Sequence, residues 1–133
     1  MDSTLEKLVV IETKLDMISK ILGLEKESII EKTKRYFELF STKNVKGLEN
    51  EMYSDDIHLR DWNGEWKGKQ AVLEMNESLF QSEFSVDIES IKKMDNTTIV
   101  QFKLHIADTE YRVIDLIDWD DSGKIKRILA YNG

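Results

Sequence analysis

The sequence predicts an α+β fold in which helices come first and a largely antiparallel sheet follows. Apolar residues recur every three to four positions up to about residue 81, and this helical period disappears from Phe84 onward. The later apolar segments are separated by breaks of two or three residues, which are typical of hairpins. A chain of 133 residues is the right size for one domain with its own core.

The helical part divides at Gly23. Residues 1–24 carry an apolar stripe with a heptad-like spacing, and we expect them to form an amphipathic helical extension. This extension either packs on its own domain or pairs with a second chain. The domain itself is expected to span residues 25–133, with helices from about residue 25 to Lys43-Asn44, over 45–53 and over 70–81.

Five segments are expected to be strands: residues 57–62, 84–93, 98–107, 110–119 and 124–131. Asn63-Gly64, which follows the first, is a strong turn signal. The strand over 110–119 is apolar on both faces, with Val113 and Ile117 on one side and Ile114 and Leu116 on the other. We therefore expect the second face of the sheet to be covered, by the N-terminal helix, by a partner subunit, or by both.

Composition excludes several functions. The chain has no Cys, so disulfides and thiol catalysis are impossible. Its 19 Lys and Arg and 26 Asp and Glu give a net charge of −7, which repels nucleic acids and anionic membrane surfaces. The longest apolar run is far shorter than a membrane span, and the first residues lack the basic region of a signal peptide. We expect a cytoplasmic protein with no nucleic-acid or membrane partner.

Two carboxylates occupy positions where the strand pattern expects apolar side chains. Asp61 shares a face with Ile57 and Leu59, and Asp115 lies between Val113 and Ile117. Burial disfavours the charged carboxylate, so each group should have a raised pKa or a dedicated hydrogen-bond partner, as general bases and neutral acid donors do. The alternative is structural: each carboxylate bonds backbone amides or reaches solvent, if the face is assigned one residue out of register.

The order of several motifs over residues 28–131 resembles the SnoaL-like and ketosteroid isomerase-like branch of the nuclear transport factor 2-like (NTF2-like) superfamily. The opening motifs are Arg35-Tyr36-Phe37-Glu38-Leu39-Phe40, Lys43-Asn44, Leu48, Tyr53-Ser54-Asp55-Asp56, Leu59-Arg60-Asp61, Gly64 and Gly68. The final hairpin matches Val113-Ile114-Asp115-Leu116-Ile117-Asp118-Trp119 and Asp121-Ser122-Gly123-Lys124-Ile125. The resemblance implies a cone, in which a curved antiparallel sheet wraps around helices and leaves an apolar pocket at one end. It also implies a homodimer across the outer face of the sheet.

By this resemblance, Asp61 matches the catalytic base of the steroid isomerases, and Tyr36 and Asp115 match the donors to the developing enolate oxygen. Relatives often carry Pro after the strand-one aspartate, whereas this chain has Trp62, whose ring could line or block the pocket mouth. The candidate pocket-lining residues are Trp62, Phe40, Phe102, Tyr111 and Trp119.

The sequence thus leaves two functions open. One is proton transfer or isomerisation on a small apolar carbonyl compound, without a cofactor. The other is non-catalytic ligand binding, or a role as a dimeric interaction module. No metal is expected, because His58 and His105 lack ligand spacing. The calcium-like loop from Asp118 has Leu129 where a bidentate Glu is required.

Overall fold

The computed structural model of the chain describes residues 29–133. The extension expected over residues 1–24 therefore lies outside the described residues, as does the start of the following helix. The helical elements are a helix over residues 29–41, the short α2 (Val45–Gly47), the π-helical segment η1 (Leu48–Met52) and α3 (Lys69–Leu79). The strands are β1 (Tyr53–Arg60), β2 (Glu65–Lys67), β3 (Phe84–Met94), β4 (Thr97–Ile106), β5 (Thr109–Trp119) and β6 (Ile125–Asn132).

The six strands form one sheet in the order β2-β1-β6-β5-β4-β3. The expected hairpins are present, and β3, β4, β5 and β6 pair with their neighbours in antiparallel fashion. The β1–β6 pair is parallel, so the sheet is mixed. The strands β3 to β6 form an antiparallel meander, and its last strand, β6, runs in the same direction as β1. Because β1 pairs with β6 at the edge of this meander, the pair is parallel.

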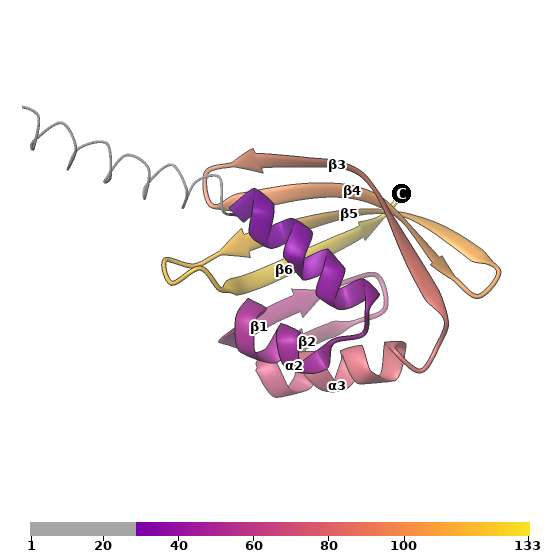
Figure 1. Ribbon diagram of the computed structural model, residues 1–133, viewed down its shortest axis with the longest axis horizontal. Coiled ribbons are helices and arrows are strands. Elements are labelled where there is room, and N and C mark those ends of the chain that lie inside the picture. The colour runs from indigo at the N-terminus through magenta and orange to yellow at the C-terminus, as the bar shows by residue number, and fades with distance from the viewer. Residues whose placement is uncertain (1–28) are drawn as a thin grey trace, which may run out of the picture.

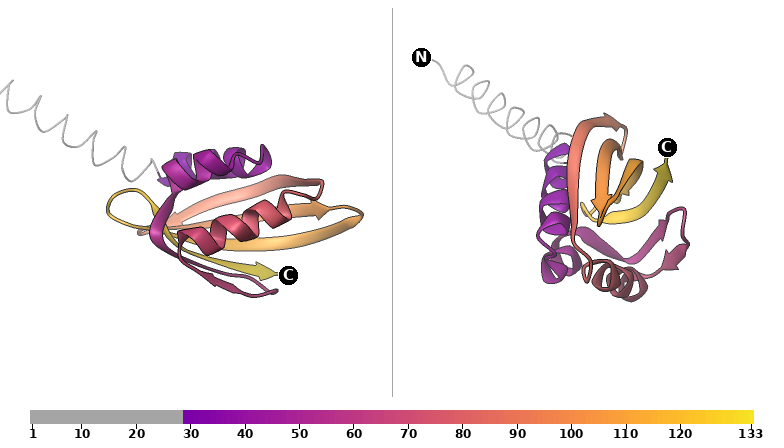
Figure 2. Two further views of the ribbon diagram at one scale, coloured as in Figure 1. Left: turned by 90° about the horizontal axis from the view of Figure 1, so that it is seen from below. Right: turned by 90° about the vertical axis from the view of Figure 1, so that its right-hand side faces the viewer.

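The sheet is strongly curved. Register shifts lie between Ile88 and Ser90 in β3, between Tyr53 and His58 in β1, and between Asp118 and Trp119 in β5. Such bulges bend a strand and increase its twist. Figures 1 and 2 show the helix over residues 29–41 lying across the concave side of the sheet, while α3 lies beside β1 and β2. This is the open cone of the NTF2-like fold that we expected.

The first strand differs from its prediction. The helix expected over 45–53 is divided into α2 and η1 and ends at Met52, and β1 runs from Tyr53 to Arg60 instead of from residue 57 to residue 62. Asp55 and Asp56 resemble a loop in the sequence because they are acidic and adjacent. They are accommodated in the strand because the irregular pairing between Tyr53 and His58 leaves both side chains exposed. The three-residue β2 was not expected at all.

The core lies between the concave sheet face and the helices. The inner face of the first helix contributes Tyr36 and Phe37, and the Phe37 ring meets Phe102 of β4 edge-on at a centroid distance of 5.0 Å. On β5, Val113 and Ile117 are fully buried, whereas Ile114 on the opposite face is 42% exposed. The inner face of this strand is therefore covered within the described residues, and covering of its outer face stays a prediction.

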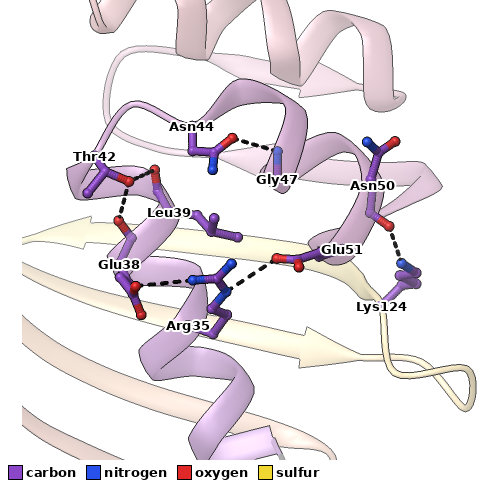
Figure 3. Close-up of polar contacts among 9 residues, drawn as sticks. All are labelled: Arg35, Glu38, Leu39, Thr42, Asn44, Gly47, Asn50, Glu51 and Lys124. Carbon is purple, nitrogen blue, oxygen red and sulfur yellow. Dashed lines mark hydrogen bonds and ion pairs between the residues drawn. The ribbon is translucent and has the colours of Figure 1, made fainter.

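Exposed polar contacts connect η1 to the first helix and to the β5–β6 hairpin (Figure 3). Arg35 bonds Glu38 on its own helix and Glu51 of η1, at 3.1 and 3.3 Å. Lys124, beyond β5, donates to the carbonyl oxygen of Asn50 at 2.6 Å. Exposed pairs of this kind contribute little to stability, but they fix the segment that leads into β1.

Candidate active site

A cavity of about 430 Å³ opens between the first helix, α3 and the concave face of the sheet. This volume is in the range of small-molecule sites. Most of its wall is aromatic or aliphatic. The polar or titratable lining residues are Tyr36, Asp61, Asn63, Asn76, Ser78 and Asp115.

The three residues singled out as catalytic candidates in the sequence all line this one cavity. Tyr36 comes from the first helix, Asp115 from the middle of β5, and Asp61 from the turn between β1 and β2. They are far apart in sequence, so their proximity is a product of the fold.

Asp115 is a buried acid. It is 5% exposed and pairs in the sheet with Val100 on β4 and Ala130 on β6, both apolar. Burial and, to a smaller extent, the negative charge of Asp61 together raise the pKa of Asp115 to about 8. At neutral pH the carboxyl group is therefore mainly protonated and can donate a hydrogen bond into the cavity.

Tyr36 belongs to a chain of buried polar groups. Burial raises the pKa of Tyr36 well above its ordinary value, and the neighbouring Tyr53 and Asp115 add to the shift. The Tyr36 ring lies 6.3 Å from the Tyr53 ring between centroids. Asn76 Nδ2 donates to the Tyr53 hydroxyl at 2.5 Å. Because a hydroxyl proton rotates freely, Tyr36 can direct its proton toward a ligand in the cavity that it lines.

Asp61 is hydrogen bonded to backbone amides, as expected if this carboxylate has a structural role. Its Oδ1 accepts from the backbone amides of Asn63 at 2.7 Å and Gly64 at 3.1 Å, which closes the turn between β1 and β2. Among the described residues, the hydrogen bonds to this carboxylate all fall on Oδ1. The same half-buried side chain lines the cavity, so Oδ2 is left for contact with a ligand.

The aromatic candidates divide into two groups. Phe40, Phe102 and Trp62 line the cavity, and Tyr111 and Trp119 are not among its lining residues. The Trp62 ring is 39% exposed and stacks on Tyr111 at 5.7 Å, so it lies at the rim and does not fill the cavity. Trp119 is buried in the core, where its Nε1 donates to Thr98 Oγ1 at 3.1 Å.

Tyr53 and Asn76 were not among the candidates. Asn76 had a detectable signal: it lies four residues after Val72, three after Leu73 and four before Phe80, so it interrupts the apolar stripe of α3. Tyr53 had no such signal in the sequence. The pattern places it at the end of a helix, whereas in the structure it is the first residue of β1.

The cavity offers acid–base chemistry through carboxyl and hydroxyl groups. Its lining residues include no Lys, Arg, His or Cys. Residues 29–133 contain no cluster of three or more His, Cys, Asp or Glu side chains that could hold a metal ion. In the acidic turn after β5, the Asp120 carboxylate is bonded to the backbone amides of Ser122 and Lys124. No helix within the described part of the chain is long and apolar enough to cross a membrane.

The profile of the SnoaL-like domain family matches residues 33–128, which is most of the chain. No curated protein matches the sequence. Solved structures share the fold at low identity. An NTF2-like protein of unknown function from Mesorhizobium loti has a TM-score of 0.73 at 16% identity, over 81% of this chain and 93% of that one.

Two further structures are similar and have names that refer to an activity. An epoxide hydrolase from M. tuberculosis described as LEH-like has a TM-score of 0.72 at 15% identity, over 82% of this chain and 85% of that one. A proposed ketosteroid isomerase from Kribbella flavida has a TM-score of 0.69 at 12% identity, over 76% and 74%. At these identities the likeness shows the fold alone.

The curved mixed sheet and the cavity on its concave side define a protein of the NTF2-like fold. The chain belongs to the SnoaL-like family of that superfamily.

Proposed function

We propose that the protein catalyses proton transfer on a small, apolar compound that contains a carbonyl group, without a cofactor. The observation that carries this proposal is the buried Asp115, an acid that stays protonated at neutral pH in a cavity it shares with Tyr36 and Asp61. A neutral acid and a phenol offer two hydrogen-bond donors, and an ionised carboxylate offers a base. Isomerisation of a carbonyl compound needs this combination.

In the proposed reaction, Asp61 removes a proton from the carbon next to the carbonyl group. The electrons of the broken C–H bond form an enolate, whose oxygen accepts hydrogen bonds from Tyr36 and Asp115. Asp61 then returns the proton, either to the same carbon or to another carbon of the conjugated system. The apolar wall strengthens these interactions because it excludes water from the charged intermediate.

The proposal is tested without knowledge of the natural substrate, by following exchange of the α-hydrogens of alpha-tetralone in D₂O with NMR. We expect exchange by the full-length protein to exceed the buffer rate, and Asp61→Asn to lower the protein-dependent rate by about 10²-fold or more. The amide oxygen can still accept the turn hydrogen bonds, so the variant should fold. Asp56→Asn is a matched control, because Asp56 is an exposed carboxylate on β1 outside the cavity.

A second measurement tests the charge coupling on which the proposal depends. Because the Asp61 charge helps to raise the pKa of Asp115, Asp61→Asn should lower the Asp115 pKa, as followed by carboxyl NMR. A pKa near 4 for Asp115 in the unaltered protein would refute the assignment of a neutral donor.

The second candidate function is non-catalytic ligand binding, and the hydrogen bonds of Asp61 favour it because they give this residue a structural role in its turn. Binding of the tetralone without any exchange would support this function over catalysis.

Two further expectations belong to the proposal: a cytoplasmic location, and a homodimer formed through the outer sheet face. Ile114 and Tyr131, which pair across β5 and β6 on that face, are 42% and 47% exposed.

A further inference from the structure

The Trp62 ring connects two parts of the molecule that are not paired in the sheet. Trp62 is in the turn between β1 and β2, and its ring stacks on the Tyr111 ring of β5, with an interplanar angle of 27°. β6 lies between β1 and β5, but its register with β5 ends at the pair of Asn132 and Val113, two residues short of Tyr111. The aromatic pair therefore bridges the end of β6 and joins the turn directly to β5.

The turn that carries Asp61 is closed by its own hydrogen bonds. The Asp61 amide donates to the carbonyl oxygen of Gly64 at 3.0 Å, and Asp61 Oδ1 accepts from the amides of Asn63 and Gly64. These bonds fix the carboxylate within the turn, but they do not fix the turn to the rest of the sheet. In the described sheet, β2 is an edge strand of three residues that pairs with β1 alone. Short elements with few neighbours open easily, so the position of the turn depends on the contacts of its side chains.

The turn places Asp61 beside Asp115. In the parallel pair of β1 and β6, Arg60 is aligned with Leu129, so one further step brings Asp61 level with Ala130. Ala130 is opposite Asp115 in the antiparallel pair of β6 and β5. The two acids therefore lie on either side of Ala130, and all three residues line the cavity. Their proximity has an electrostatic effect, because burial and then the charge of Asp61 raise the pKa of Asp115.

We propose that Trp62 and Tyr111 are positioning residues, whose stacked rings hold the β1–β2 turn at the cavity and so keep the Asp61 carboxylate beside Asp115. This inference rests on the proposed function, in which Asp61 is the base and Asp115 donates to the same ligand. Proton transfer needs the base and the donor at a fixed separation, because a small misplacement of reacting groups lowers the rate steeply. The rings act from the rim, where Trp62 lines the cavity and Tyr111 does not.

Tyr111 gives the more selective test, because its substitution breaks the stack without replacing a residue of the cavity wall. Tyr111→Leu removes the ring and keeps an apolar side chain on β5, and Tyr111→Phe is the matched control that keeps a ring. The readout is the pKa of Asp115, followed by carboxyl NMR in the full chain. We expect Tyr111→Leu to lower this pKa toward the value found in Asp61→Asn, because the Asp61 carboxylate moves away. Tyr111→Phe should leave the pKa unchanged.

A double-mutant cycle separates positioning from the exclusion of water. Water that enters the cavity after loss of the stack would also lower the Asp115 pKa, without any movement of Asp61. In an Asp61→Asn background the charge is absent, so a positioning role predicts that Tyr111→Leu has no further effect there. An equal fall of the pKa in both backgrounds would show that the rings only exclude water, and it would overturn the inference.

Trp62→Leu breaks the same stack from the side of the turn, so the test does not depend on a single variant. The fall in the Asp115 pKa should again be larger when Asp61 is present than in the Asp61→Asn background. Trp62→Phe keeps a ring and should restore most of the pKa. An unchanged Asp115 pKa in either Leu variant that still unfolds cooperatively would overturn the inference.

The exchange of the α-hydrogens of alpha-tetralone gives a second readout. Misplacement of the base affects the chemical step more than binding. Tyr111→Leu should therefore lower the exchange rate at saturating tetralone by about tenfold or more, with a smaller change in the half-saturating concentration. A change confined to the half-saturating concentration would identify the rings as a binding surface and overturn the inference.

The outcomes distinguish this inference from the proposed function. If the protein catalyses exchange but loss of the stack leaves the Asp115 pKa unchanged, the inference fails and the proposed function stands. If the pKa falls only when Asp61 is present and no exchange is found, the rings position Asp61 and catalysis fails. If Asp61→Asn itself leaves the Asp115 pKa unchanged, the two carboxyl groups are not held together and the inference is overturned.

Discussion

Among single residues, Asp115 links the stability of the folded state to pH. An isolated Asp has a pKa of 3.8, and burial raises the pKa of Asp115 to about 8. The folded protein therefore binds one more proton than the unfolded chain between these two values. The stability contributed by this group is complete below about pH 4 and is lost progressively as the pH rises to about 8.

Because the stability that Asp115 contributes falls as the pH rises, replacing this residue should change how unfolding depends on pH. Relative to Asp115→Asn, which cannot ionise, the unaltered protein should lose stability as the pH rises from about 4 to 8 and then change no further. The difference across this range should be on the order of 5 kcal/mol. Urea unfolding of both proteins at a series of pH values measures it. Parallel pH profiles would show that Asp115 is ionised throughout.

The sequence could indicate Asp61 and Asp115 because an acid in an apolar strand pattern is visible without any structure. Tyr36 came only from the family resemblance. Asn76 could be noticed as a polar residue in an apolar helical stripe, but its importance lies in its contact with Tyr53 and in the lack of a partner for Oδ1. Both features depend on tertiary structure, because they exist only when α3 packs against β1.

At the scale of elements, the junction between β2 and α3 depends on one glycine. Gly68 has a φ of +91° and a ψ of 151°, a conformation that residues with a Cβ atom rarely adopt, and its amide donates to Ile57 of β1 at 2.7 Å. The junction therefore sets where α3 begins relative to the strand that leads to Asp61. α3 in turn carries Asn76.

We predict that Gly68→Ala destabilises the protein by about 1–3 kcal/mol, although an added Cβ would meet nothing within 4 Å. The cost is conformational and not steric. Gly64→Ala, in the neighbouring turn, is the control: its backbone needs no positive φ and its Cβ would meet the Trp66 ring at an ordinary 3.4 Å, so stability should change by less than about 0.5 kcal/mol. Thermal unfolding compares the two variants, and equal stabilities would contradict the prediction.

The helices and hairpins were predictable because each has a local signal: apolar period, turn residues and short breaks. The hairpin turns at Asp95, Ala107 and Gly123 all adopt positive φ, and the breaks were recognised at or beside each of them. The start of β1 was missed because the irregular pairing with β6 allows acidic residues in a strand, and that pairing involves residues about seventy positions away. Local pattern does not contain this information.

At the scale of the whole molecule, the outer face of the sheet carries an apolar patch made of Ile114 and Leu116 on β5 and Leu129 and Tyr131 on β6. These residues are directly opposite one another in the strand register. A patch of this kind on a small acidic protein is typical of an interface. It is the surface that the proposed homodimer would bury.

We predict that Ile114→Lys shifts the protein from twice the chain mass to the chain mass in light scattering, because it places a charge in the middle of the buried patch. Met94→Lys is the matched control, since Met94 is 64% exposed at the end of β3 and outside the patch. An unaltered protein that already has the mass of one chain would contradict the dimer. So would an unchanged dimer in the Ile114 variant.

The α+β class of the fold could be predicted from the sequence, but the order of the strands in the sheet could not. The α+β order follows from local periods, whereas the place of β6 between β1 and β5 follows from nothing local. The cavity is even harder to predict from the sequence. Its lining residues come from the first helix, α3 and five strands, so its volume depends on how all these elements pack.

The parallel pairing of β1 with β6 also orders events in time. Residues 53–60 must wait for residues 125–132, and closing so long a loop is a slow step in folding. The β3–β4 and β4–β5 hairpins can form while the protein is still being synthesised, but Leu59 and Asp61 meet the wall formed by β5 and β6 only when β6 has left the ribosome. The cavity therefore cannot form before β6 has been synthesised, and a chain interrupted before β6 has hairpins but no site.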